Sequence, residues 1–425
     1  MAQGKAVSWR ATSAAVAFGV FVLVLFVGVN LRTSILAVPP LLAIISTDLN
    51  LNHSQTGLLT SLPSLMMGLG AWPAGRVAAR IGGRMSVVLG LALATLGTVA
   101  RGLWPTTIGL YVFTAALAAG IAVAQTAIPT LARQWFPERI GLVSAVFTDG
   151  LTLGETLAAA LTAPLMRAWF GPNAWPAALL IWAIPMTVAL LLWLWLAPPA
   201  PRIPPHPADA RLVVMAAQTA ARKRARRDRQ VGPWLIGAVM AGGSVVYFGM
   251  NGWVAPYNQA KNANSMTSLA LFAINAAQLP VCIGLTFLAQ RVAGKRWPFL
   301  VAGGVALVAV TGWLLTPPTL EPLWGALIGG ASAAVFTLSI ALPAIFATGA
   351  RVARLSGGSL GVNYTATFVG PYIGGVLWDW FHLPWLAFLP VLVAALILLV
   401  AALLLPDPPP HGAILEDPAA FAAIE

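Results

Sequence analysis

Long apolar stretches are the feature of this sequence that most restricts its fold. A helix needs about 20 apolar residues to cross the hydrocarbon core of a bilayer, and the chain contains twelve stretches of that kind. To within a few residues at each edge, they lie at 14–45, 54–76, 85–103, 108–132, 141–165, 174–197, 234–258, 266–290, 297–316, 321–348, 355–378 and 383–405. The sequence therefore predicts an all-α membrane protein with twelve transmembrane helices.

Composition agrees with this prediction and excludes other classes. Of the 425 residues, 59% are hydrophobic and 8% are charged, whereas about a quarter of the residues in a soluble domain are charged. A water-soluble enzyme and a disordered chain are therefore excluded. The single cysteine, Cys282, excludes an internal disulfide and a thiolate metal cage, and its apolar surroundings indicate a small core residue.

Lysine and arginine are distributed unevenly among the predicted loops. If both termini are inside the cell, 20 of the 24 basic residues lie on the cytoplasmic side. The outer loops then hold Arg101, Arg167 and Lys261, and Arg32 stays within the first stretch. Because cytoplasmic loops are rich in Lys and Arg, we expect a multi-pass protein of the inner membrane with both termini in the cytoplasm.

A basic linker divides the chain into two halves of six stretches each. It starts with the Pro-rich segment 198–207, which cannot continue a helix, and contains the densest run of charge, residues 222–229. No aromatic partners accompany this run, so we expect it to lie at an anionic lipid surface and not on a nucleic acid. The expected organisation is an N-terminal bundle at 1–197, the linker at 198–233, a C-terminal bundle at 234–405 and a cytoplasmic tail at 406–425.

The two halves resemble repeats. One offset of 211 residues relates three positions after the second stretch to three after the eighth, namely Arg80, Gly83 and Arg84 to Arg291, Gly294 and Lys295. Two six-helix halves related along the membrane normal are a transporter architecture, with the substrate bound between them near the midplane. The sequence therefore predicts two pseudo-symmetric bundles with a site between them.

The loop after the second stretch resembles the signature of the major facilitator superfamily. In that family a Gly is followed by Asp-Arg and then by a Gly and a basic residue. Gly75, Arg80, Gly83 and Arg84 match this pattern, while Ala79 replaces the family's Asp. The resemblance implies the major facilitator fold and a gating role for the four matching residues.

Two further segments resemble a narrower group, the cyanate and 2-nitroimidazole transporter family. One runs from Asn30-Leu31-Arg32 through Pro39–Leu42 to Gly57–Pro63, and the other is Asn363–Ala366 with Gly370-Pro371. This resemblance implies transport of small anions or small polar organic molecules. The stretch 361–375 also resembles the antiporter motif of drug/proton exchangers. Because small residues allow close helix approach and Pro allows a bend, we interpret Gly370 and Pro371 as a gating hinge.

Three charged residues lie well within the predicted spans: Arg32, Asp149 and Glu155. Each costs about 2.5–3.5 kcal/mol at a helix centre, so such residues normally face a cavity or a partner. Arg32 is either an anion contact or a structural ion-pair partner. Counted from the inner ends of their helices, Arg32 lies roughly 22 Å deep, Glu155 roughly 21 Å and Asp149 roughly 12 Å. Glu155 is therefore the expected partner of Arg32 and the proton-coupling acid. Asp149 is a proton relay or a capping group.

Uncharged polar residues recur at similar depths. Each could contact a substrate or hydrogen-bond to a neighbouring helix. The candidates for substrate contact, besides Arg32, are Asn30, Gln125, Tyr247, Asn251, Trp253, Gln278, Asn363 and Tyr364. Asn275 lies three residues before Gln278, on the same helix face.

No catalytic set and no nucleotide-binding loop is found in the sequence, and the four histidines have no metal spacing. We expect no cofactor, no metal and no enzymatic activity. The sequence predicts a monomeric secondary transporter that moves a small anion, or a small polar organic molecule, with protons across the bilayer by alternating access. The alternatives are a proton-coupled exporter of apolar drugs and, from another class, a channel or lipid scramblase.

Overall fold

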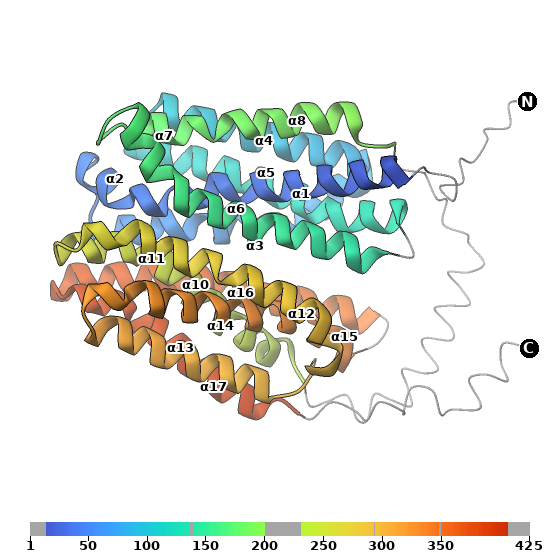
Figure 1. Cartoon of the computed structure of the whole chain (residues 1–425). Coiled ribbons are helices and arrows are strands. Elements are labelled where there is room, and N and C mark those ends of the chain that lie inside the picture. Colours follow the sequence, from blue (N-terminus) through green and yellow to red (C-terminus); the bar gives the residue numbers. More distant parts are fainter. Residues whose placement is uncertain (1–13, 137–138, 200–230, 293, 348–349, 407–425) are drawn as a thin grey trace, which may run out of the picture.

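Helices make up all the regular structure that is described. The computed structural model describes residues 14–136, 139–199, 231–292, 294–347 and 350–406. Within these ranges the chain forms two bundles, one blue to green and one yellow to red in Figure 1. Most of the linker, including the basic run at 222–229, and nearly all of the tail lie outside the described residues.

The N-terminal bundle contains the helices up to residue 196. Pro39 and Pro40 interrupt its first predicted stretch, because proline lacks the N–H that continues a helix. The elements are α1 (Ala14–Leu36), η2 (Pro39–Leu41), α2 (Leu42–Asp48), α3 (His53–Ile81), α4 (Gly83–Leu103), α5 (Thr107–Trp135), α6 (Ile140–Trp169), α7 (Trp175–Ile181) and α8 (Ala183–Leu196).

The C-terminal bundle repeats this pattern of long and interrupted helices. Its elements are α10 (Pro233–Ala260), α11 (Asn264–Ala276), α12 (Gln278–Val292), α13 (Trp297–Leu315), η4 (Pro318–Leu320), α14 (Glu321–Ser339), α15 (Leu342–Phe346), α16 (Ala350–Phe381), η5 (Pro384–Phe388) and α17 (Leu389–Leu404).

Each predicted stretch corresponds to one α-helix or to two consecutive ones, in some cases together with a short 3₁₀ helix. Nine segments of the described chain are long and apolar enough to cross a membrane. The other three stretches correspond to α3, α6 and α16, which have 29, 30 and 32 residues. These three helices are more polar because they line the interface between the bundles, where part of their surface faces protein and not lipid.

Each bundle has its own apolar core, and small residues bring its helices together. Leu31, Leu110 and Trp193 belong to the N-terminal core, and Phe299 and Trp313 to the C-terminal one. Gly90 and Gly120 lie where α4 crosses α5, and a Cβ atom on Gly90 would come within 2.5 Å of the Gly120 carbonyl oxygen. Close helix approach of this kind is how membrane helices associate without a hydrophobic driving force.

The two ends of the molecule differ in how the bundles meet. We call the end where α1 and α10 begin the proximal end, and the end that carries α2 and the first turn of α3 the distal end; they lie right and left in Figure 1. Towards the distal end α3 and α16 touch backbone to backbone, since a Cβ on Gly57 would lie 2.5 Å from the Pro371 oxygen. Towards the proximal end, Gly75 of α3 and Gly361 of α16 have open space around them among the described residues.

The internal repeat is visible where α3 and α12 end. Gly82 and Gly294 follow α3 and α12, and both have positive φ, at 84° and 80°. Glycine adopts this conformation without the steric penalty of a Cβ atom. The ends of α3 and α12, Ile81 and Val292, are 211 residues apart, which is the predicted offset, whereas the two positive-φ glycines are 212 residues apart.

Candidate functional site

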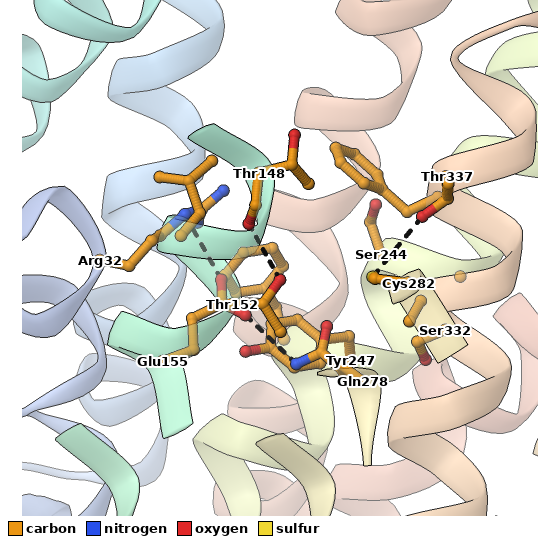
Figure 2. Close-up of a pocket in the computed structure, with 15 residues that line it drawn as sticks. Arg32, Thr148, Thr152, Glu155, Ser244, Tyr247, Gln278, Cys282, Ser332 and Thr337 are labelled. Carbon is orange, nitrogen blue, oxygen red and sulfur yellow. Dashed lines mark hydrogen bonds and ion pairs between the residues drawn. The ribbon is translucent and has the colours of Figure 1, made fainter. Parts of the chain in front are cut away.

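A central cavity lies between the two bundles. It has a volume of about 570 Å³, including the part open to solvent. Figure 2 shows its polar lining, to which α1, α6, α10, α12 and α14 contribute. The polar lining residues are Arg32, Thr148, Thr152, Glu155, Ser244, Tyr247, Gln278, Cys282, Ser332 and Thr337.

Arg32 and Glu155 form an ion pair at this cavity. Arg32 Nε lies 3.4 Å from Glu155 Oε1, and the two side chains are only 9% and 7% exposed. The contact is an ion pair without hydrogen-bond geometry, because Nε and Nη1 of Arg32 have no hydrogen-bond partner among the described residues. The structure thus brings together the two residues that the depth argument paired, and leaves donors of the guanidinium available.

The C-terminal bundle adds neutral polar groups to this pair. Gln278 Nε2 donates to Glu155 Oε2 at 3.2 Å, which links the two bundles (Figure 2). Tyr247 donates its hydroxyl to Asn275 Oδ1 at 2.5 Å. Asn275 Nδ2 in turn donates to Asn251 Oδ1 at 2.9 Å. The Tyr247 hydroxyl and the amides of Asn275 and Asn251 are therefore held by hydrogen bonds within their own bundle.

The charge of the cavity comes from the N-terminal bundle. Among the described lining residues, Arg32 and Glu155 are the ionisable pair, and the lining residues of α10, α12 and α14 are uncharged. The ring of Phe248 lies with its centroid 5.9 Å from Arg32 Cζ, within reach of a cation–π contact. A guanidinium with unpaired N–H groups beside one carboxylate can bind an anion, and the carboxylate can hold a proton.

Some of the predicted contact residues do not lie at this cavity. Asn251 lines a second, smaller cavity. Five others line neither cavity: Asn30, Gln125, Trp253, Asn363 and Tyr364. Asn30, for example, donates to the Phe26 carbonyl of its own helix, and Trp253 packs against Trp378 with ring centroids 5.7 Å apart. Periodicity could not separate these residues from the cavity lining, because a polar group within a membrane helix can also bond to its own helix or a neighbouring one.

Asp149 is half-buried on α6 and does not line the central cavity. It is six residues before Glu155, which turns it to another side of the helix. The geometry separates the two acids as their spacing predicts.

The residues predicted to gate the protein lie in different environments. Gly75 and Arg80 are exposed at the proximal end. Arg84 donates from Nη2 to the Leu194 carbonyl at 2.7 Å, so it joins α4 to α8 within one bundle. Gly83 packs against Leu131 of the same bundle. Gly370 packs against Val245, and Pro371 lies inside the continuous helix α16, at its contact with Gly57.

One prediction about a single residue is wrong. Arg101, expected in an outer loop, is fully buried in the last turn of α4, so Arg32 is not the sole basic residue inside the membrane region. Arg101 was missed because it lies at the edge of its stretch. Cys282 is buried, as predicted for a core residue, and it also lines the cavity with its sulfur 3.8 Å from Thr337 Oγ1.

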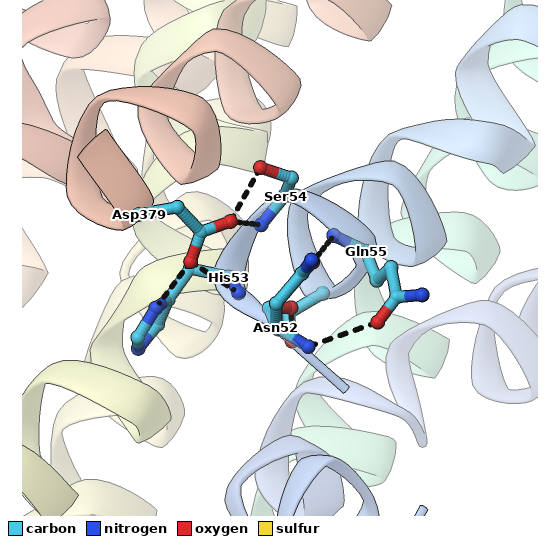
Figure 3. Close-up of polar contacts among 6 residues, drawn as sticks. Asn52, His53, Ser54, Gln55 and Asp379 are labelled. Carbon is cyan, nitrogen blue, oxygen red and sulfur yellow. Dashed lines mark hydrogen bonds and ion pairs between the residues drawn. The ribbon is translucent and has the colours of Figure 1, made fainter. Parts of the chain in front are cut away.

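A polar contact at the distal end also escaped the sequence analysis. Asp379 Oδ1 accepts from the His53 backbone N–H at 2.9 Å, and Oδ2 accepts from the Ser54 backbone N–H at 2.7 Å and from the Ser54 hydroxyl at 2.5 Å (Figure 3). The carboxylate therefore sits on the N-terminus of α3, where the helix dipole favours an anion. The Asn52–Gln55 capping box, visible in the sequence, fixes this helix start.

Comparison with known proteins places this geometry in context. The model of the Major Facilitator Superfamily matches residues 16–368. The chain is 28% identical over 369 residues to a 2-nitroimidazole transporter of Escherichia coli, covering 84% of this chain and 87% of the relative. It is 25% identical over 363 residues to a cyanate transport protein of the same organism, covering 83% and 88%. The crystal structure of a D-xylose–proton symporter has the same fold, with a TM-score of 0.70, 15% identity, and coverage of 90% of this chain and 97% of that one.

Proposed function

This chain belongs to the major facilitator superfamily of transporters, and from that premise we propose that it is a secondary transporter which carries a small anion together with a proton by alternating access. The observation that carries the proposal is the buried Arg32–Glu155 pair at the cavity between the bundles. As a member of this family, the chain is a multi-pass membrane protein and not an enzyme.

Arg32 is the group that recognises the anion. Its Nε and Nη1 have no hydrogen-bond partner among the described residues, and a guanidinium can grip a planar anion with two parallel bonds. The names of the two bacterial relatives, for cyanate and 2-nitroimidazole, support a substrate of similarly small size. An apolar drug would gain nothing from a buried guanidinium.

Glu155 couples this recognition to a proton. Without substrate, the Glu155 carboxylate pairs with the Arg32 guanidinium. An arriving anion competes for Arg32, and a buried carboxylate that loses its cation is costly unless it takes a proton. The negative charge of the substrate and the proton then cross together, so no isolated charge moves through the membrane.

Closure at the distal end supports alternating access. Asp379 of α16 binds the start of α3, and Gln259 of α10 donates to Thr47 of α2 at 3.2 Å. In the opposite state these contacts open and the proximal ends of α3 and α16 approach each other. The free space around Gly75 and Gly361 would allow that approach.

The proximal end faces the cytoplasm, and the protein acts as a monomer in the inner membrane. With Arg101 buried, the outer side keeps only Arg167 and Lys261 of the basic residues assigned to it, which strengthens the positive-inside argument. A cysteine placed in the 198–233 linker should react with an impermeant thiol reagent only after lysis. Labelling in intact cells would show that the linker lies outside the cell and would refute the proposed orientation.

Anion uptake into proteoliposomes, with and without an imposed pH gradient, tests the coupling. Glu155→Gln mimics the protonated carboxyl, so the variant should still exchange anions but should no longer accumulate them in response to the gradient. Asp149→Asn is the matched control on the same helix and should keep most of the coupling. Gradient-driven accumulation by Glu155→Gln at the wild-type level would refute Glu155 as the coupling acid.

A further inference from the structure

A second cavity lies on the distal side of the central one. It has a volume of about 390 Å³, including the part open to solvent, and it includes Ile35 and Leu36, about one turn of α1 beyond Arg32 towards the distal end. Phe248 lines both cavities, so the two cavities adjoin at this residue. The polar residues around the second cavity are Thr60, Arg101, Thr114 and Asn251.

Arg101 brings a full positive charge to this cavity without an acidic partner. Its side chain is completely buried, and one nitrogen, Nη2, donates to the Ser34 carbonyl at 2.5 Å. Nε and Nη1 have no hydrogen-bond partner among the described residues, nor does any described carboxylate form an ion pair with this guanidinium. A buried cation in this state is costly unless something else satisfies it.

A purely structural role explains only part of this arrangement. Ser34 lies in the last turn of α1, so one Arg101 N–H group stabilises the negative end of that helix. This leaves two guanidinium nitrogens unexplained, and the hydroxyl of Thr114, which lines the same cavity, is also buried without a partner among the described residues. Two groups that lack hydrogen bonds and line one cavity indicate a ligand that completes them.

We propose that Arg101 and Thr114 form a second binding station for the transported anion, on the distal side of Phe248. The proposal rests on the proposed function and extends it. Arg101 binds the anion when the distal end is open, Thr114 contributes a hydroxyl, and the anion then passes Phe248 to reach Arg32. The substrate therefore meets a guanidinium at two successive depths, and its negative charge is balanced at each of them.

Saturation kinetics from each face of the membrane test the proposal. Uptake of nitrate, cyanate and acetate is measured in right-side-out and inverted vesicles. Arg101→Gln should raise the half-saturating concentration at the distal face about tenfold or more, because charge-assisted hydrogen bonds are lost. At the proximal face, where the anion meets Arg32 first, the change should stay below about twofold.

Thr114→Val keeps the experiment decisive if Arg101→Gln does not fold. This substitution removes one hydroxyl without changing the volume, and should raise the distal half-saturating concentration about threefold. If the Thr114 hydroxyl does not contact the anion, its removal should leave the distal half-saturating concentration unchanged. Thr98→Val on α4 is the control, since Thr98 is fully buried, bonds only to its own helix in the described structure and lines neither cavity.

The outcomes separate this inference from the proposed function. An unchanged distal half-saturating concentration in Thr114→Val, or a lower maximal rate at both faces without any change in half-saturation, overturns the second station and leaves Arg101 as a support of α1. If the wild-type protein carries none of the three anions, the proposed function itself fails. An Arg32-dependent wild-type uptake with no effect at Arg101 or Thr114 overturns only the second station.

Discussion

The two bundles repeat one arrangement of helices but contribute different chemistry to the space between them. The N-terminal bundle supplies the charged side chains of both cavities, Arg32, Glu155 and Arg101. The C-terminal bundle supplies uncharged ones, among them Tyr247 and Gln278. Duplication of a fold therefore does not duplicate a site, because helix packing depends on small and apolar residues while recognition depends on a few polar ones.

This division has a reason in membrane energetics. A charge within the bilayer is tolerated where a partner or water stabilises it, and Arg32 and Glu155 meet within one bundle by the packing of α1 on α6. Their contact does not depend on how the bundles are placed. The neutral groups of the other bundle can then move relative to the pair without leaving a charge unpaired.

At the distal contact the two bundles exchange these roles. There the C-terminal bundle supplies the charge, Asp379, and the N-terminal bundle supplies backbone N–H groups and His53, whose Nδ1 lies 2.8 Å from Asp379 Oδ1. Unlike the Arg32–Glu155 pair, this contact joins the bundles and must break when the distal end opens. The charged pair within one bundle supports recognition of the substrate, whereas the charged contact between the bundles supports closure of the distal end.

The largest effect is expected at Arg32. Arg32→Ala should weaken anion binding by about a hundredfold or more, because two charge-assisted hydrogen bonds are lost. Arg32→Lys keeps the charge without the fork and should give an intermediate loss. Arg167→Ala, an exposed arginine of the same bundle, should bind normally. Binding is measured by thermal shift with nitrate and cyanate, and normal binding by a folded Arg32→Ala protein would show that Arg32 does not recognise the anion.

A smaller effect is expected at the distal contact. Asp379→Asn should shift the conformational equilibrium about tenfold towards distal opening, since a charged acceptor of several hydrogen bonds is replaced by a neutral one. Spin labels at Pro105→Cys and Lys261→Cys, in a Cys282→Ser background, would report the shift as a longer distance. Asp48→Asn is the matched control, because Asp48 bonds to Trp175 within one bundle. Equal distances in the two variants would show that Asp379 does not hold the distal end closed.

The pH dependence of this contact follows from the same hydrogen bonds. Asp379 lies just beyond the predicted span 355–378. Burial by itself would raise the pKa of its carboxyl, but the hydrogen bonds from Ser54 and His53 outweigh burial and leave the pKa below its usual value. A carboxyl with a lowered pKa stabilises the contact fully at any pH above the pKa that it has when the contact is open, and it loses that contribution as the pH falls through the lower value. The contribution of Asp379 should therefore stay constant from about pH 5 to 8, and the spin-label distance of the wild-type protein measures it.

The smallest effect is expected from the neutral bundle. Gln278→Leu should lower anion transport about fivefold, because Glu155 loses one hydrogen bond but keeps its ion pair with Arg32. The response to the pH gradient should remain. Gln125→Leu, whose side chain lines neither cavity, should transport normally. Glu155→Gln should abolish gradient-driven accumulation. If Gln278→Leu abolished it as well, residues of both bundles would take part in proton coupling, and the contrast between a charged and a neutral bundle would be refuted.

Local rules account for the residues that sequence analysis found. Arg32 and Glu155 could be paired because both lie at a similar distance along helices that run in the same direction, and a fixed rise per residue turns that distance into depth. Tyr247 and Gln278 could be found as polar groups within apolar stretches, but so could Gln125 and Trp253, which lie elsewhere. The depth of a side chain in the membrane follows from its position along its own helix. Whether that side chain faces a cavity depends on which helices pack next to it.

The sequence by itself determined that the chain is helical, where its long apolar segments lie and which charges the membrane must compensate, because hydrophobic length and charge cost are properties of single segments. Only the tertiary structure decided that Arg101 turns inward and that Asp379 meets Ser54 across 325 positions of sequence. It also decided that Phe248 lines two cavities. The contact of Arg101 with Ser34 depends on the packing of α4 against α1 within one bundle. The other two depend on how two separately packed bundles are placed against each other, and no local propensity specifies either arrangement.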